Sequence, residues 1–147
     1  AGSLAFLPYG ALVDHFQHWV YENPNASPKE RKNQWLELEK IYQPGKNYDN
    51  LDFFKNGGFW QKQAHIYEMP FYYIDYTLAQ VCAFQFWIRM QEDKESAWKD
   101  YLNLCKAGGS MSFLDLVKLA KIKSPFDTKV FEEVTNKINN WLNDNSL

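Results

Sequence analysis

The 147-residue sequence predicts an all-α fold, a compact multi-helix bundle or array. Three observations favour this fold class. Apolar residues recur at three- and four-residue spacing through most of the chain. Helix-starting signals precede several of these segments. No segment shows the strict apolar–polar alternation of a half-buried β-strand. We therefore expect a single all-helical domain over residues 1–147.

Two helices are expected in the first third of the chain. Pro8 suits the first turn of the first helix, where its missing N–H costs no hydrogen bond. The helical pattern then continues until Asn23–Pro24. Ser27 and Glu30 form a capping-box pattern that begins the second helix. That helix is predicted to end before Pro44, because proline cannot continue it.

Further helical segments are predicted over residues 51–55, 59–67, 71–91, 93–106, 112–121 and 130–143. The sequence Asn-Gly-Gly at 56–58 predicts a break between the first two. Gly108 is expected to end its helix in the left-handed conformation that glycine favours. Ser112 repeats the capping pattern before the short helix that follows it.

Composition excludes several classes of protein. Charged residues make up 23% and the formal net charge is −2, so a basic nucleic-acid-binding face is not expected. No apolar run approaches the ~20 residues that span a membrane. No basic-then-apolar leader is recognisable, and Cys82 and Cys105 are the only cysteines. We therefore expect reduced thiols and a cytoplasmic location.

The segment "DHFQHWVYE", residues 14–22, brings together residues that can bind a metal. His15, His18 and Glu22 can share one face of a helix. The specific zinc-helix pattern, H-E-x-x-H, separates its histidines by four residues, whereas here the spacing is three. Histidines in such a pattern are more often exposed, or at the edge of the core, than bound to a metal. An independent metal protein is the weaker alternative, and it should lose its zinc on His18→Ala.

The segment "HIYEMPFYYIDYTLAQ", residues 65–80, is unusually rich in phenols. Tyr72 and Tyr76, and likewise Tyr73 and Tyr76, are spaced to share one helix face, and the turn at Pro70 can bring His65 near them. Phenol and imidazole groups can donate hydrogen bonds to charge that develops on a substrate oxygen. Ordinary core packing is the alternative, although buried phenols need polar partners.

Three segments resemble a known family. "FLPYGALVDHFQHWVYENP", "GGFWQKQAHIYEMPFYYIDYTLAQVCAFQFW" and "AGGSMSFLDLVKLAKIKSPF" are similar to the C-terminal part of oligoendopeptidase F, a thimet-oligopeptidase-like zinc metallopeptidase. The resemblance covers Ser3 to about Leu142. It implies a metallopeptidase, a zinc-dependent hydrolase of short peptides, and it places this chain in the C-terminal portion of a larger helical catalytic domain.

The resemblance also implies what this chain lacks. The zinc of the family is held by the two histidines of an HExxH helix and by a glutamate on a later helix. None of these segments is in this sequence, so we expect them upstream and expect no metal ligand here. The position of His15 departs from the family pattern, which more often has Glu. The fragment alone should be inactive, and its partners should be short peptides, the upstream half of the enzyme and further copies of itself.

The resemblance assigns roles to residues by position. His65 matches the family histidine and Tyr76 matches the tyrosine expected to stabilise the oxyanion, so these two are the catalytic candidates. Tyr73, Tyr72 and Tyr67 are the candidates for binding substrate, and the sequence leaves open which of them does so. A stand-alone helical module that binds a peptide or partner helix without cleaving it is the alternative function.

Overall fold

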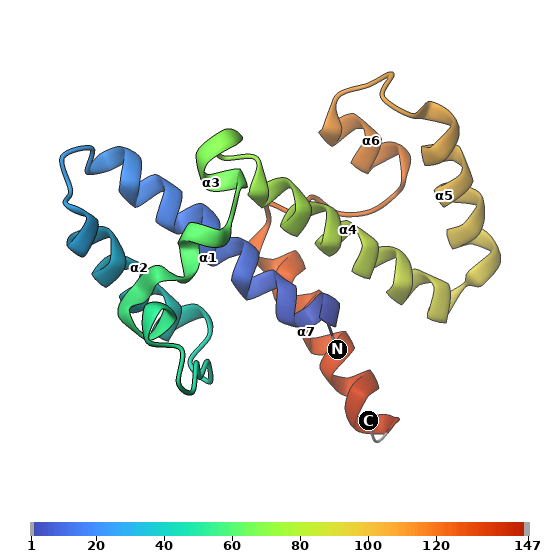
Figure 1. Ribbon diagram of the computed structural model, residues 1–147. Coiled ribbons are helices and arrows are strands. Elements are labelled where there is room, and N and C mark those ends of the chain that lie inside the picture. Colours follow the sequence, from blue (N-terminus) through green and yellow to red (C-terminus); the bar gives the residue numbers. More distant parts are fainter. Residues whose placement is uncertain (1, 146–147) are drawn as a thin grey trace. The chain divides into compact units, whose positions relative to one another are not determined.

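The computed structural model describes residues 2–145 and is built from helices (Figure 1). The α-helices are α1 (Gly2–Glu22), α2 (Pro28–Tyr42), α3 (His65–Glu68), α4 (Tyr73–Glu92), α5 (Lys94–Ala107), α6 (Phe113–Leu119) and α7 (Thr128–Asp144). A π-helical turn, η1 (Phe54–Gly58), and a 3-10 turn, η2 (Phe59–Lys62), lie between α2 and α3. No strand occurs over residues 2–145, and the all-α prediction is confirmed.

The chain divides into two compact units, one extending to Thr77 and the other starting at Leu78. The boundary therefore falls inside α4. The expectation of a single domain stays a prediction, and each unit is described by itself. Within residues 2–145, no helix is long and apolar enough to cross a membrane.

The first unit is built around an aromatic core between α1, α2 and η2. Phe16 of α1 packs edge-on against Trp35 of α2, with ring centroids 5.2 Å apart, and lies at the same distance from Trp60. The buried members of this core are Leu12, Val13, Phe16, Trp35, Leu38, Phe59 and Trp60. Four of these seven residues are aromatic.

Helix α1 begins earlier than predicted, and Pro8 lies inside it rather than in its first turn. A proline inside a helix removes one backbone hydrogen bond. Packing of the preceding turns supplies a compensation, since Leu7 is buried and the ring of Phe6 lies 5.8 Å from that of Tyr73. The prediction for Pro8 was therefore wrong because tertiary contacts extend the helix across it.

The predicted helix at 59–67 is also broken. Its first part is the turn η2, and Gln63 has an extended backbone before α3 begins. Helix α4 starts at Tyr73 rather than at residue 71, because Phe71 has a φ of +60° that no helix can include. Met69 has extended φ, as expected for the residue before Pro70.

The break predicted at 56–58 is present. Gly57 has a φ of +79°, and a Cβ atom there would lie 2.2 Å from the backbone oxygen of Lys32 in α2. Two features therefore require glycine at this position: the positive φ angle and the close approach of the α2 backbone. This contact holds η1 against α2.

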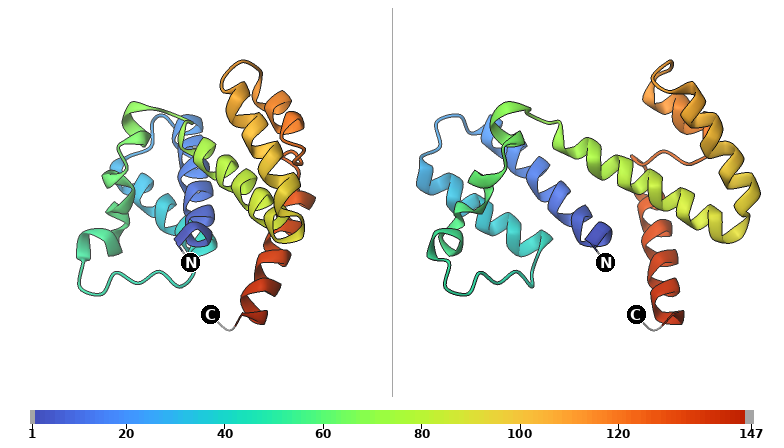
Figure 2. Two further views of the ribbon diagram at one scale, coloured as in Figure 1. Left: turned by 90° about the vertical axis from the view of Figure 1, so that its right-hand side faces the viewer. Right: turned by 45° about the vertical axis from the view of Figure 1, so that its right-hand side comes forward.

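In the second unit, α5 and α6 pack against each other and lie side by side in the views of Figures 1 and 2. Side-chain caps begin three of its helices: Asp93 for α5, Ser112 for α6 and Asp127 for α7. The first two agree with the predicted starts. The buried apolar residues of this unit are Val81, Ile88, Ala97, Val117, Ala120, Val130, Val134 and Ile138.

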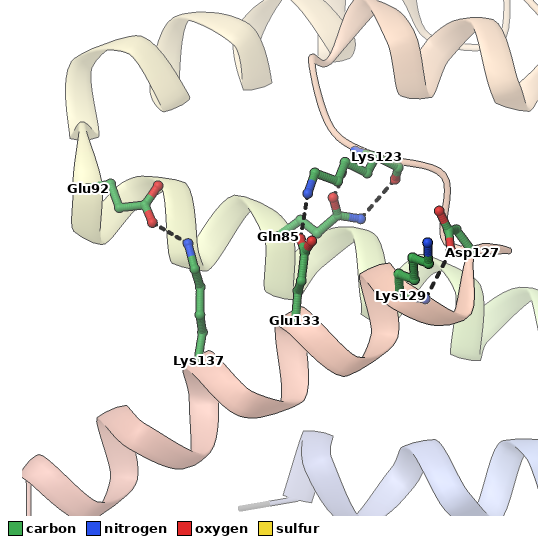
Figure 3. Close-up of polar contacts among 7 residues, drawn as sticks. All are labelled: Gln85, Glu92, Lys123, Asp127, Lys129, Glu133 and Lys137. Carbon is green, nitrogen blue, oxygen red and sulfur yellow. Dashed lines mark hydrogen bonds and ion pairs between the residues drawn. The ribbon is translucent and has the colours of Figure 1, made fainter.

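A network of polar side chains joins α4 to α7 and to the segment before it (Figure 3). The side-chain amide of Gln85 donates to the backbone carbonyl of Lys123 at 2.9 Å and accepts from the backbone N–H of Lys123 at 2.8 Å. One side chain therefore satisfies both backbone groups of Lys123. Lys123 also pairs with Glu133, and Lys137 pairs with Glu92. These contacts hold the α6–α7 connection on α4.

Asp100 is a buried charged residue of the second unit. Arg89 contacts one of its carboxylate oxygens at 2.5 Å and Lys121 contacts the other at 3.0 Å. Arg89 also donates to the carbonyl of Ala120 at 2.8 Å. The hydrogen bonds from Arg89 and then Lys121 hold the pKa of Asp100 below its usual value of 3.8, against the opposing effect of desolvation.

This lowered pKa predicts loss of stability in acid. A carboxyl group with a depressed folded-state pKa stabilises the fold above its unfolded-state value and loses that contribution as the pH falls through the folded value. We expect the Tm of the chain to fall below about pH 4, and Asp100→Asn to be less stable at neutral pH with a shallower acid dependence. Thermal melts between neutral pH and pH 2 measure this. The control is Glu37→Gln, which removes an exposed pair with Lys40 and should change Tm little. If the Tm of the wild type and that of Asp100→Asn fell equally in acid, Asp100 would not be the source of the acid sensitivity.

Candidate functional site

Four of the sequence-predicted residues meet in the first unit, and we call them the His65 cluster: His65, Tyr72, Tyr73 and Tyr76. The centroid of the His65 ring lies 5.0 Å from Tyr73 and 5.8 Å from Tyr76, both edge-on, and 6.3 Å from Tyr72, which it stacks against. The tyrosines also contact one another, with Tyr76 lying 5.3 Å from Tyr72 and 5.6 Å from Tyr73. An imidazole and three phenols therefore form one contiguous group.

The turn between α3 and α4 brings these rings together. His65 is the first residue of α3, and its carbonyl accepts the N–H of Met69 at 3.0 Å. The carbonyl of Met69 in turn accepts the N–H of Tyr72 at 3.2 Å. Pro70 and the left-handed Phe71 reverse the chain between them. The short α3 and this tight turn place the start of α4 beside His65.

Helix α1 also contacts the cluster. Tyr9 packs edge-on against Tyr73 at 5.9 Å. Further along α1, a Cβ atom on Gly10 would lie 1.9 Å from the hydroxyl oxygen of Thr77. Helices α1 and α4 therefore approach closely next to Tyr76, and a larger residue at position 10 would require the Thr77 side chain to move.

The cluster has one half-buried and two exposed phenols. Tyr72 and Tyr76 are 39% and 42% exposed, whereas Tyr73 packs against the aromatic core. The hydroxyl of Tyr72, with smaller effects from desolvation, Tyr73 and Asp75, raises the pKa of Tyr76. Burial raises the pKa of Tyr73. Both phenols therefore keep their protons at neutral pH and can donate hydrogen bonds to a ligand.

Tyr67 lies apart from the His65 cluster. Its ring stacks on Trp60 at 5.7 Å, with 24° between the planes, and it is 56% exposed. Over residues 2–145 it has no ring contact with His65 or the other three tyrosines. The structure thus brings together four of the five candidate residues.

The histidines of the first helix have separate partners. His15 shares a hydrogen bond of 3.1 Å with the hydroxyl of Tyr42. His18 lies 3.5 Å from the carboxylate of Asp14 and packs on Phe71 at 4.8 Å. The part of the chain that the structure describes has no group of three His, Cys, Asp or Glu side chains arranged to hold a metal ion.

Two residues that contact the cluster were not predicted from the sequence. Gln63 hydrogen-bonds His65 at 2.8 Å, and Tyr9 hydrogen-bonds Gln63 at 2.9 Å. Gln63 is two residues from His65 in the sequence, but a single glutamine is not part of any motif that would predict this contact. Tyr9 is distant in sequence and reaches the site only through the packing of α1. The phenols of the His65 cluster can present hydrogen-bond donors to one anionic or carbonyl oxygen.

The model of peptidase family M3 matches residues 3–135. The solved structure of PZ peptidase A with an inhibitor is 55% identical, with a TM-score of 0.92, and the match covers 97% of this chain and 25% of that one. A structure of an oligoendopeptidase F is 56% identical, with a TM-score of 0.91 and the same coverage.

A third structure, an oligoendopeptidase F from Bacillus anthracis str. Ames, is 47% identical with a TM-score of 0.76, over 97% of this chain and 22% of that one. A search of curated proteins gives no match. The chain thus spans about a quarter of the length of the solved relatives that it matches. The family model covers most of the chain, and its structural relatives share about half of its residues. The chain therefore belongs to peptidase family M3.

Proposed function

We propose that this chain forms the substrate-binding and oxyanion-stabilising wall of a zinc-dependent oligopeptidase that hydrolyses short peptides. The observation that carries the proposal is the His65 cluster, in which an imidazole lies against three phenols, two of them exposed. Family membership and the relatives named as peptidases support a peptide substrate.

The chemistry of the cluster suits an acyl-transfer transition state. When a nucleophile adds to a peptide carbonyl, negative charge develops on the oxygen, and a donor that meets that charge accelerates the reaction. We assign this donation to Tyr76, aided by His65. Tyr72 and Tyr73 would hydrogen-bond the peptide backbone. Tyr67, beside Trp60, would contact a more distant part of the substrate.

Peptidases of family M3 are zinc-dependent, but the described residues of this chain do not form a site for the metal. The zinc ligands would belong to a segment upstream of this sequence, and no step through the metal is assigned to these residues. We propose that the chain has no peptidase activity by itself and acts with that upstream segment.

Exposed apolar side chains in each unit support such a partner. Large apolar residues with at least 40% exposure include Phe53 and Tyr67 in the first unit and Trp98, Phe126 and Phe131 in the second. Exposed large apolar side chains that lie next to one another often mark a contact surface. We propose that the upstream segment covers part of it, and that the separate chain associates with itself.

A chimera tests the proposed function. The matching quarter of PZ peptidase A is replaced with residues 3–145 of this chain, which is feasible because the folds superimpose with a TM-score of 0.92. We expect the chimera to hydrolyse a short fluorogenic peptide and the 147-residue chain alone not to. The measurement is the initial rate for each protein under the same conditions.

The control is the same chimera with His65→Gln and Tyr76→Phe together, checked for native-like folding by circular dichroism. This variant should bind the peptide but cleave it very slowly. A folded double variant that is as active as the chimera would contradict the assigned roles. A folded chimera that binds peptide without cleaving it would favour the helical binding module instead.

A further inference from the structure

His65 stands at the end of a short hydrogen-bonded chain that begins on α1. The hydroxyl of Tyr9 donates to Oε1 of Gln63 at 2.9 Å. Nε2 of Gln63 lies 2.8 Å from Nδ1 of His65. Gln63 is held in the extended segment between η2 and α3, and its side chain is partly buried. One glutamine amide thus links a phenol on α1 to the histidine of the cluster.

The orientation of this amide follows from its partner on α1. Burial, with smaller effects from Tyr73 and Glu39, raises the pKa of Tyr9, so its hydroxyl stays protonated. Among the described residues, the Gln63 side chain is the one hydrogen-bond partner of that hydroxyl. If the amide were reversed, its NH2 group would face the phenol, and the phenolic proton would have no acceptor among the residues that the structure describes. A partly buried donor without an acceptor is unfavourable, so Oε1 faces Tyr9 and the NH2 group faces His65.

This orientation decides which nitrogen of His65 carries the proton. An amide N–H can donate to Nδ1 only if Nδ1 has a free lone pair, and in a neutral imidazole the proton is then on Nε2. We propose that Gln63, held by Tyr9, is a positioning residue that fixes His65 in the Nε2–H tautomer, so that the ring donates from Nε2 to the substrate oxygen. The donation to substrate rests on the proposed function, whereas the tautomer rests on these two hydrogen bonds alone.

The chain offers a matched pair of variants. Gln63→Glu keeps the shape of the side chain but replaces the NH2 donor with an acceptor, so Nδ1 of His65 must carry a proton to bond with it. Gln61→Glu adds the same charge two residues earlier, on an exposed side chain without a hydrogen bond to His65 among the described residues. A difference between the two variants therefore reports the contact rather than the charge.

The first test is the ¹⁵N NMR spectrum of the imidazoles in the full chain, recorded at a pH where they are neutral. The chain has three histidines, and His65→Gln identifies the signals of His65. We expect Nε2 to be protonated and Nδ1 unprotonated in the wild type and in Gln61→Glu, and the reverse in Gln63→Glu. A proton on Nδ1 in the wild type, or identical tautomers in the two Glu variants, would overturn the proposal.

The second test is kinetic and uses the chimera with PZ peptidase A at the same pH. Loss of a group that hydrogen-bonds a metal-ligating histidine typically costs about 10–100-fold in activity. We expect a fall of this size in kcat/KM for Gln63→Glu and little change for Gln61→Glu. Equal rates in both variants would refute the positioning role. If the tautomers are as expected but a folded His65→Gln, Tyr76→Phe chimera keeps full activity, the tautomer stands and the proposed function fails.

Discussion

Tyr76→Phe in the chimera is expected to lower kcat by about 10²–10³-fold, the usual cost of removing one donor to a developing oxyanion. The hydroxyl is lost while the ring, and hence its packing on His65 and Tyr73, is retained. KM should change little, because a bond made mainly in the transition state does not contribute to substrate binding. Steady-state kinetics with one short peptide measure both constants.

Tyr72→Phe is the matched control for this prediction. Tyr72 is exposed to a similar degree and also contacts the His65 ring, and its own ring packs on that of Tyr76. Because it is assigned to the ground-state binding of the peptide, its loss should raise KM more than it lowers kcat. If Tyr76→Phe raised KM alone, or if Tyr72→Phe caused the larger fall in kcat, the assigned roles would be wrong.

Trp35→Ala is expected to destabilise the first unit by about 3–5 kcal/mol, the range found when a buried tryptophan is truncated. Trp35 is fully buried, and its ring packs edge-on against Phe16 and stacks on Phe59. Its indole N–H also donates to the buried carboxylate of Glu39 at 3.3 Å. The substitution therefore creates a cavity and removes a donor from a buried charge.

Urea denaturation of the 147-residue chain, followed by circular dichroism, measures this loss. Trp98→Ala is the control, because it removes the same side chain from an exposed position and should change stability by about 0.5 kcal/mol or less. Trp35→Phe, which keeps an aromatic ring but not the N–H, should lie between the two. A midpoint for Trp35→Ala equal to that of Trp98→Ala would show that the aromatic core does not stabilise this unit.

Local signals in the sequence predicted the elements whose ends depend on their own residues. Ser27 and Glu30 form the expected capping box at α2, and Ser112 caps α6 as expected. The errors arose where packing at a distance decided the backbone. Helix α1 continues through Pro8 because its first turns pack on Tyr73, and nothing near Pro8 in sequence shows this.

The same distinction applies to the site. The spacing of Tyr72, Tyr73 and Tyr76 predicted that they share a helix face. Tyr76 does contact both of the others, although Tyr72 lies just before α4 begins. Their separation from Tyr67 was not predictable, because it depends on the backbone of Gln63 and on stacking with Trp60. The contacts that Tyr9 of α1 makes with Tyr73 and Gln63 were not predictable either, because they depend on how α1 packs in the tertiary fold.

The most direct test of the central assignment is the binding of a phosphinic peptide, whose tetrahedral anionic group resembles the oxyanion, to the chimera and to its Tyr76→Phe variant. If Tyr76 stabilises that charge, the inhibition constant should rise by about the same 10²–10³-fold as kcat/KM falls, while affinity for a product peptide stays unchanged. Equal affinity of both proteins for the phosphinic peptide would show that Tyr76 does not contact the oxyanion.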